Sequence, residues 1–246
     1  MALKFFLSDS ANSWRESLLF TDDDRITAIV ENEARNSCIN ITPQEIAEQA
    51  LCRHGKAVKD AMQTFPNRHR TANRTAVQGD HSEWLAKFEA VKGLIGTGAI
   101  IALLGPRGTG KTQLATATAR WGVETRGMGD LTRQAVRYAV LGELLASIKA
   151  TFSGNGGSES DILAPLTRCN LLVLDECHEC NGSEWAVRVL TLLIDARYRE
   201  RRDTIMIANL TPEELLAAVG PSVASRMDEC GYFVMCEWQS LRGASR

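Results

Sequence analysis

The sequence lacks a long apolar run and has almost no excess charge of either sign. No apolar stretch reaches the roughly 18 residues that a membrane-spanning helix needs, and the N-terminus has no basic segment followed by an apolar one, as a secretion signal would. The formal net charge is −2 over 246 residues, so the protein as a whole does not attract nucleic acid or lipid surfaces. We therefore expect a cytoplasmic protein without membrane contact, in which any nucleic-acid contact comes from a local patch.

A disulfide framework is also missing. The seven cysteines are an odd number and are scattered along the chain, which is typical of reduced thiols. Cys177 and Cys180 form a C-x-x-C pair, and Cys169 lies a short way upstream. Zinc would require four ligands in tetrahedral reach. Ordinary thiols are the favoured interpretation of these three cysteines, and a zinc site is the alternative.

The first part of the chain has a helical pattern. Within residues 1–65 the clearest helix start has Thr42 at the N-cap, Pro43 at the first helical position and Glu45 at the third, which makes a capping box. We expect residues 1–65 to form a small helical domain that binds a partner. Residues 66–82 lose the apolar period and contain three arginines, so they are expected to form a solvated linker, with phosphate contact as the alternative.

The remaining residues, 83–246, alternate short apolar runs with helical stretches. Buried parallel strands that alternate with helices explain such a pattern. The sequence therefore predicts an α/β fold with a parallel sheet between layers of helices. The expected strands are residues 99–104, 136–140, 171–174 and 204–208.

A phosphate-binding loop follows the first expected strand and precedes a helix. It matches G-x-x-x-x-G-K-[ST] in the structural context that this motif requires. The glycines let backbone N–H groups surround phosphate oxygens, and the following helix N-terminus adds its dipole. Lys111 is expected to reach the β- and γ-phosphates of ATP, and Thr112 to hold Mg²⁺. The loop consists of Gly105, Pro106, Arg107, Gly108, Thr109, Gly110, Lys111 and Thr112.

Three polar residues at strand ends complete the expected chemistry. Asp175 and Glu176 follow the strand 171–174; the aspartate is placed to meet Mg²⁺ and the glutamate to act as general base toward water. Asn209 follows the strand 204–208 and is placed to orient that water. The alternative for Asp175 and Glu176 is a pair of solvated acids at a strand end. The alternative for Asn209 is an ordinary turn residue.

The order and spacing of these motifs resemble the DnaC/IstB-like family of AAA+ ATPases, which contains bacterial and phage replicative helicase loaders and transposition helpers. The resemblance covers roughly residues 83–246. Besides the phosphate-binding loop and the segment Leu171–Glu176, five segments carry it: Val136–Tyr138, Ile194–Tyr198, Ala208–Leu215, Ala224–Met227 and Glu237–Arg242.

The resemblance implies an AAA+ P-loop NTPase core and assigns roles to single residues. Asn209 falls on the sensor-1 position, and Arg226 on the arginine that reaches into the ATP site of a neighbouring subunit, which implies an ATP-dependent homo-oligomer. A salt bridge at a helix end is the alternative for Arg226. Ser222 stands where loaders often have a second arginine. Because about 20 residues follow Arg226, we expect no full C-terminal helical lid.

The first functional hypothesis is a helicase loader that hydrolyses ATP and binds single-stranded DNA and a replicative helicase. In relatives the region after the second strand helps to hold DNA, so Arg133, Arg137 and Lys149 are candidate backbone contacts. The second hypothesis is an IstB-like helper that acts on duplex DNA with a transposase. A nucleotide or small-molecule kinase is the third, which Arg226 and the pair Asp175–Glu176 argue against. The fourth is an adaptor with ATP as a structural ligand.

Overall fold

The computed structural model describes residues 52, 55–70, 82–126, 135–152, 158–180 and 182–238. The chain divides into two compact units, residues 1–57 and 58–246, and the second is described below. The capping box at Thr42 and the candidate DNA contact Arg133 lie outside the described residues.

Five strands form one sheet in which every neighbouring pair is parallel. The strands are β1 (Ile100–Leu104), β2 (Val136–Val140), β3 (Leu171–Asp175), β4 (Asp203–Ala208) and β5 (Gly231–Met235). Their order across the sheet is β2-β3-β4-β1-β5. The four strands expected from the sequence are confirmed, and the edge strand β5 was not expected.

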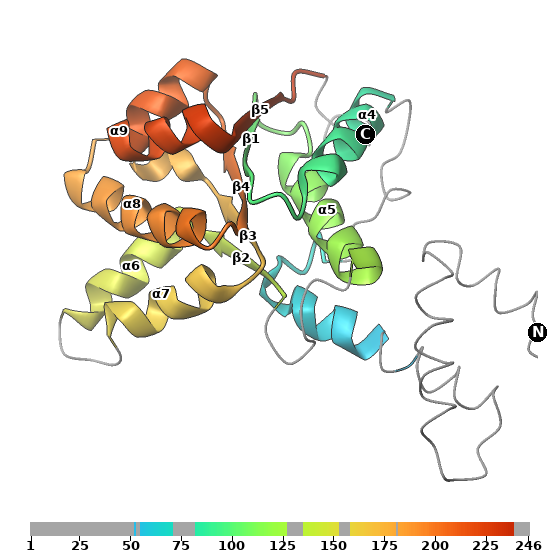
Figure 1. Ribbon diagram of the computed structural model, residues 1–246, viewed down its shortest axis with the longest axis horizontal. Coiled ribbons are helices and arrows are strands. Elements are labelled where there is room, and N and C mark those ends of the chain that lie inside the picture. Colours follow the sequence, from blue (N-terminus) through green and yellow to red (C-terminus); the bar gives the residue numbers. More distant parts are fainter. Residues whose placement is uncertain are drawn as a thin grey trace, which may run out of the picture. The chain divides into compact units, whose positions relative to one another are not determined.

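Helices cover both faces of the sheet (Figure 1). They are α4 (Ser82–Leu94), α5 (Lys111–Arg126), α6 (Leu141–Thr151), α7 (Glu159–Arg168), α8 (Glu184–Arg199) and α9 (Pro212–Cys230). Helices α4 and α5 pack on one face, and α6 to α9 on the other. The predicted α/β architecture of helix, sheet and helix layers is confirmed.

Each central strand sends alternate side chains into the two layers, as the pleat requires. In β1, Ile100, Ala102 and Leu104 join the core beneath α6 to α9, whereas Ile101 and Leu103 join the core beneath α4 and α5. All residues of β1, β3 and β4 are buried. This burial on both faces explains why the sequence shows continuous apolar runs there instead of an alternating pattern.

The segment just before the predicted linker belongs to this second unit. Val58, Met62 and Phe65 are buried in the core beneath α4 and α5, and Met62–Thr64 forms the short 3-10 helix η2. The unit therefore begins at Val58, whereas the domain boundary predicted from the sequence lay at Phe65. The helical spacing of these residues did not reveal which domain buries them.

A buried arginine joins the ends of several elements on the side of α8. Arg197 is 1% exposed and donates hydrogen bonds to the carbonyl oxygens of Leu166 and Cys169, at 2.6 and 2.9 Å. It also donates to the Thr204 hydroxyl at 2.9 Å and to the Asp203 carbonyl. Its guanidinium thus ties the end of α7 to the start of β4.

We predict that Arg197→Met lowers the free energy of unfolding by about 3 kcal/mol or more, because buried carbonyl groups lose their donors. Arg199→Met is the matched control, since Arg199 lies on the same helix and is exposed. Urea unfolding followed by circular dichroism measures both variants. Equal stability of the two would contradict a structural role for the buried guanidinium.

Candidate nucleotide site

The phosphate-binding loop connects β1 to α5 and has the backbone conformation that its glycines permit. Gly105, Gly108 and Gly110 have φ values of 132°, 89° and 80°, in the region that side-chain-bearing residues rarely adopt. A Cβ atom on Gly105 would also lie 2.4 Å from the Cys236 carbonyl oxygen. The motif therefore needs glycines at these positions because the turn requires positive φ values and, at Gly105, because the backbone of Cys236 packs too closely for a side chain.

Lys111 is the first residue of α5 and is 5% exposed. Its Nζ donates to the carbonyl oxygens of Gly105 at 2.7 Å and Pro106 at 2.6 Å, which keeps the ammonium group against the loop. Pro106 and Arg107 are exposed, and Thr109 is buried. The N-terminus of α5 and this ammonium group together favour a negatively charged ligand such as a phosphate.

Asp175 meets the loop directly. The Thr112 hydroxyl donates to Asp175 Oδ2 at 2.8 Å, and the Glu176 backbone N–H donates to Oδ1 at 2.8 Å. Mg²⁺ prefers oxygen ligands, keeps several waters and usually takes one or two carboxylates plus substrate phosphates. A hydroxyl and a carboxylate in contact beside the phosphate-binding loop fit that ion. The structure thus brings together the two residues predicted to hold the metal.

Glu176 is exposed just beyond β3, with a positive φ of 56° that is uncommon for a non-glycine residue. Partial burial raises the pKa of its carboxyl group, and so does the neighbouring Glu179 through a side-chain hydrogen bond and charge repulsion. A raised pKa makes a carboxylate a better proton acceptor near neutral pH. This position and environment suit the role predicted for Glu176.

Asn209 follows Ala208, the last residue of β4. The sheet register pairs Ala208 with Leu104 at the end of β1, and β4 lies between β1 and β3. Asn209 therefore lies at the same edge of the sheet as the phosphate-binding loop and Asp175, as its predicted role requires.

Arg226 lies on α9 and contacts α8. Its Nε is 2.7 Å from Asp195 Oδ1, and its guanidinium lies over the Tyr198 ring at 5.4 Å from the centroid. It also donates to the Ser222 carbonyl at 2.7 Å. Arg226 therefore forms an ion pair, which is the alternative to an active-site role that the sequence analysis gave for it. This ion pair holds the guanidinium on the α8–α9 surface.

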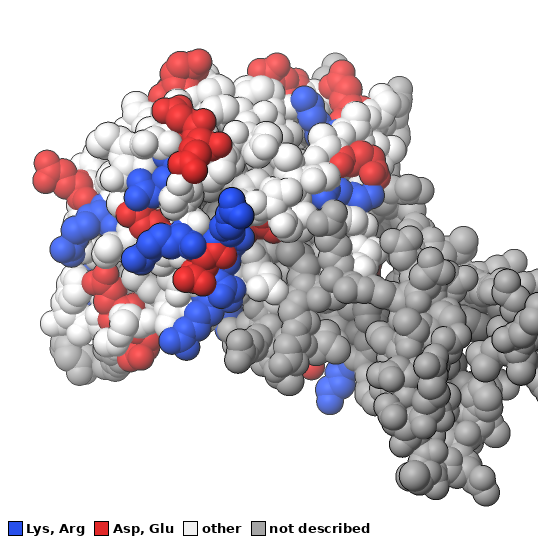
Figure 2. Space-filling model, viewed as in Figure 1, with Lys and Arg blue, Asp and Glu red and all other residues white. Residues whose placement is uncertain are grey.

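Arg137 and Lys149, the two candidate DNA contacts that the structure describes, lie in different surroundings. Arg137 lines a shallow pocket between β2, α6 and α7, whereas the Lys149 ammonium lies over the Trp185 ring, 4.9 Å from its centroid. On the face shown in Figure 2, the described Lys and Arg side chains are interspersed with Asp and Glu over α6 to α9. A DNA contact there would thus be local.

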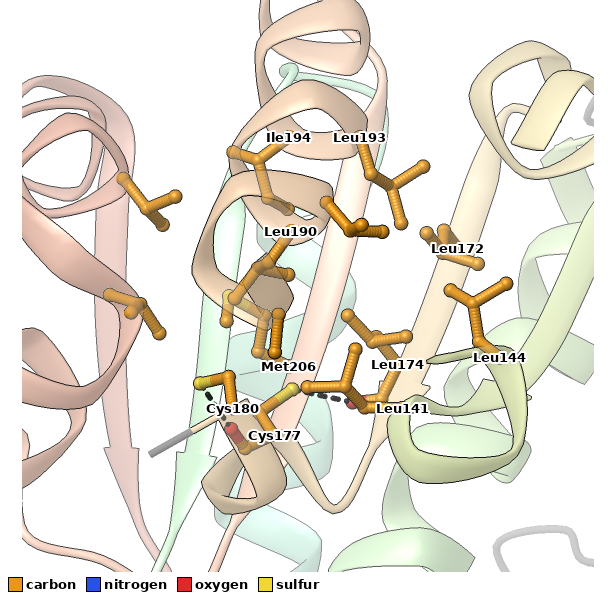
Figure 3. Close-up of a cluster of buried hydrophobic side chains, with 14 of the residues drawn as sticks. Leu141, Leu144, Leu172, Leu174, Cys177, Cys180, Leu190, Leu193, Ile194 and Met206 are labelled. Atoms are coloured by element: carbon orange, nitrogen blue, oxygen red, sulfur yellow. Dashed lines mark hydrogen bonds between the residues drawn. The ribbon is translucent and has the colours of Figure 1, made fainter. Parts of the chain in front are cut away.

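Cys177 and Cys180 lie in the short helix η3 (Cys177–Cys180) and point into the apolar core (Figure 3). The Cys177 thiol donates to the Leu174 carbonyl, and the Cys180 thiol to the Cys177 carbonyl. Burial raises the pKa of both thiols and of Cys169. Among the described residues, no three His, Cys, Asp or Glu side chains are grouped to hold a metal. In the described part of the chain, the three cysteines are core residues.

Two contacts to the site were not expected from the sequence. The Tyr138 hydroxyl donates to Asp175 Oδ2 at 2.7 Å, and burial beside that carboxylate raises the pKa of the phenol. The Trp238 indole donates to the Thr109 carbonyl at 2.8 Å. Both residues belong to segments that carry the family resemblance, but no sequence spacing indicates which atoms of the site they reach.

Residues 46–225 match a family described as IstB-like ATP binding protein, and this match spans more than half of the chain. The chain belongs to the IstB-like ATP-binding family. Membership confirms the resemblance inferred from the motifs. Among the described helices, none is long and apolar enough to cross a membrane.

Curated relatives of this family member include helicase loaders. Replicative helicase loader DnaC of Escherichia coli (strain K12) is 29% identical over 139 residues, covering 56% of this chain and 54% of the relative. DnaC of Buchnera aphidicola subsp. Baizongia pistaciae is 30% identical over 124 residues, covering 50% and 48%. The chain thus spans about half the length of the curated relatives it matches.

Solved structures with a similar fold include those of replication proteins. A crystal structure of the DnaC helicase loader has a TM-score of 0.57 at 20% identity, covering 69% of this chain and 99% of that one. AMPPCP-bound DnaA from Aquifex aeolicus has a TM-score of 0.53 at 21% identity, covering 68% and 50%. These likenesses confirm the predicted α/β fold, with helices on both faces of a parallel sheet, for this IstB-like chain.

Proposed function

We propose that this protein is an ATPase of the helicase-loader type, which binds single-stranded DNA and delivers a replicative helicase. The observation that carries the ATPase part is the contact between Thr112 and Asp175, with Glu176 next in the chain. A loop that only binds phosphate does not need a carboxylate hydrogen-bonded to its threonine, as Asp175 is, or a second carboxylate next in the chain, as Glu176 is. Family membership and the helicase-loader relatives support the rest.

In the proposed reaction, Glu176 accepts a proton from a water molecule as the water oxygen forms a bond to the γ-phosphorus of ATP. The bond from that phosphorus to the β–γ bridging oxygen breaks, which yields ADP and phosphate. Lys111 neutralises charge on the β- and γ-phosphates, and Asn209 orients the water. Mg²⁺, held by Thr112 and Asp175, would supply further positive charge to the phosphates when bound.

Arg226 is proposed to act on the ATP of a neighbouring subunit. Asp195 and Tyr198 hold it on the α8–α9 surface, while Lys111, Thr112 and Asp175 meet at the carboxyl edge of the sheet. The ion pair and an active-site role are compatible, because Asp195 can orient a guanidinium that also faces a second subunit. Hydrolysis would then depend on assembly.

We predict that Arg226→Ala and Lys111→Ala are each inactive alone and recover ATPase activity when mixed. One keeps an intact phosphate-binding loop and the other an intact Arg226, so a mixed interface contains both. Loss of such an arginine typically costs ~10³-fold or more in rate, whereas a partly exposed ion pair is worth only ~1 kcal/mol of stability. Phosphate release at rising protein concentration measures the recovery.

Two results would remove Arg226 from the active site. The first is normal turnover of Arg226→Ala. The second is a mixture that stays inactive although affinity-tagged Arg226→Ala protein retains untagged Lys111→Ala protein, which shows that the two variants assemble together.

An aromatic cluster supports the proposed binding of single-stranded DNA. Phe152, at the end of α6, is 64% exposed, and its ring meets the Trp185 ring edge-on at 6.2 Å between centroids. Lys149 lies over the same tryptophan. An exposed aromatic ring can stack on an unpaired base, while a neighbouring ammonium pairs with the phosphate backbone.

We predict that Phe152→Ala weakens binding to a fluorescein-labelled oligo(dT) about tenfold, because base stacking contributes ~1–3 kcal/mol per base. Phe233→Ala is the matched control, since Phe233 is 40% exposed on β5, at the opposite edge of the sheet. Fluorescence anisotropy with ATP and Mg²⁺ measures both affinities. Equal losses, or no loss in either variant, would remove the cluster from the DNA site.

The helicase part of the proposal has one rival. The second candidate function is the IstB-like helper of DNA transposition that the sequence analysis considered, which would act on duplex DNA with a transposase; the match to the IstB-like ATP-binding family keeps it open. The N-terminal residues are proposed to carry the partner contact in either case. Because Val58, Met62 and Phe65 pack into the second unit, a truncation that tests this must remove residues 1–57 and keep Val58 onward.

Affinity capture from the native host with the full chain and with residues 58–246 tests the partner. We expect the full chain to retain a replicative helicase and the truncated chain to lose it, while both bind ATP. Capture of a transposase, with preference for duplex over single-stranded DNA, would favour the second candidate. Helicase capture by the truncated chain would overturn the role of the N-terminal residues.

A further inference from the structure

Asp175 receives hydrogen bonds from three directions. The Thr112 hydroxyl and the Tyr138 hydroxyl both donate to Oδ2, at 2.8 and 2.7 Å, and the Glu176 N–H donates to Oδ1 at 2.8 Å. The terminal torsion of an aspartate is broad and does not fix the carboxylate plane by itself. Donors on both oxygens fix that plane, and Tyr138 is the donor that comes neither from the phosphate-binding loop nor from the residue next to Asp175 in the chain.

Tyr138 lies on β2, which is an edge strand of the described sheet and pairs there with β3. The other edge of β2 is met at this residue by η2, where the Thr64 hydroxyl accepts the Tyr138 backbone N–H at 2.9 Å. The buried ring of Phe65 packs against the Tyr138 ring with 5.5 Å between centroids. Both the backbone and the ring of Tyr138 are thus held by the residues that precede the predicted linker.

The segment Gln63–Arg70 is itself tied to the rest of the unit. Arg70 donates to the Gln63 carbonyl at 2.7 Å and to the Phe65 carbonyl at 3.1 Å. Arg120, on the helix that begins with Lys111, donates to the Arg70 carbonyl at 3.3 Å. These contacts form one chain of interactions from α5 through the segment to Tyr138 and on to Asp175.

We propose that Tyr138 is a positioning residue for the metal-binding carboxylate Asp175, and that Gln63–Arg70 holds Tyr138 in place. The proposal rests on the proposed role of Asp175 in holding Mg²⁺. An outer hydrogen-bond partner orients a metal ligand without touching the ion, and its loss typically reduces metal affinity 10–100-fold. The hydroxyl of Tyr138 stands in that relation to Asp175.

The experiment compares the wild type, Tyr138→Phe and Tyr232→Phe. Tyr232 is the control, because it is 46% exposed on β5 and pairs with Ile101 near the start of β1, at the end of the strand that lies away from the phosphate-binding loop. A fluorescent, non-hydrolysable ATP analogue is titrated in EDTA and in Mg²⁺, and the ratio of the two dissociation constants gives the effect of the metal. Thermal melting of each variant reports its fold.

We expect Tyr138→Phe to bind the analogue in EDTA as the wild type does, and to lose about tenfold or more of the enhancement by Mg²⁺. Tyr232→Phe should keep the full enhancement. A merely structural role of Tyr138 would lower affinity in EDTA as well. Full enhancement by Mg²⁺ in Tyr138→Phe would overturn the proposal, whereas a wild type that shows no enhancement would overturn the metal role of Asp175 itself.

Thr64→Val tests the second half of the proposal. Valine keeps the shape of threonine and removes the acceptor for the Tyr138 N–H, so we expect a smaller loss of Mg²⁺ enhancement in the same direction. If Tyr138→Phe loses the enhancement and Thr64→Val retains all of it, the segment does not position Tyr138.

Discussion

The site depends on one carboxylate, that of Asp175, whose residue is only 7% exposed. Burying a carboxylate is costly unless hydrogen bonds replace the lost water. Three donors do so, from the phosphate-binding loop, from β2 and from the chain just after β3. The same bonds that offset the cost of burial also fix where the carboxylate points. The three hydrogen bonds to Asp175 thus serve both the stability of the fold and the geometry of the site.

The parallel sheet brings the other functional groups to this carboxylate. In a parallel sheet all strands end at one edge, and ligands of open α/β sheets bind outside those ends. The order β3-β4-β1 places Asp175, Asn209 and the phosphate-binding loop on neighbouring strands. At the opposite end of β3 and β4, Arg197 bonds the carbonyls of Cys169 and Asp203. The buried guanidinium therefore fixes the strands whose other ends carry the site.

Much of the fold and site followed from the sequence because the responsible signals are local. The phosphate-binding loop requires glycines at fixed offsets, and its turn is confirmed by the positive φ values of Gly105, Gly108 and Gly110. The buried strands appear as apolar runs because both faces are covered. Strand β5 was not predicted from the sequence, because Tyr232 and Phe233 are exposed and the strand therefore lacks the continuous apolar run of a central strand.

The sequence by itself determined the nucleotide loop, the acidic strand end and the family, since each depends on residues close together in the chain. Only the tertiary structure decided that Val58–Phe65 belongs with the second unit, that Cys177 and Cys180 are core thiols, and that Tyr138 bonds Asp175. These contacts join residues separated by long stretches of chain, 37 residues in the case of Tyr138 and Asp175. No periodicity encodes such a pairing, because it is set by strand order and by which side chains the packed layers bring within reach.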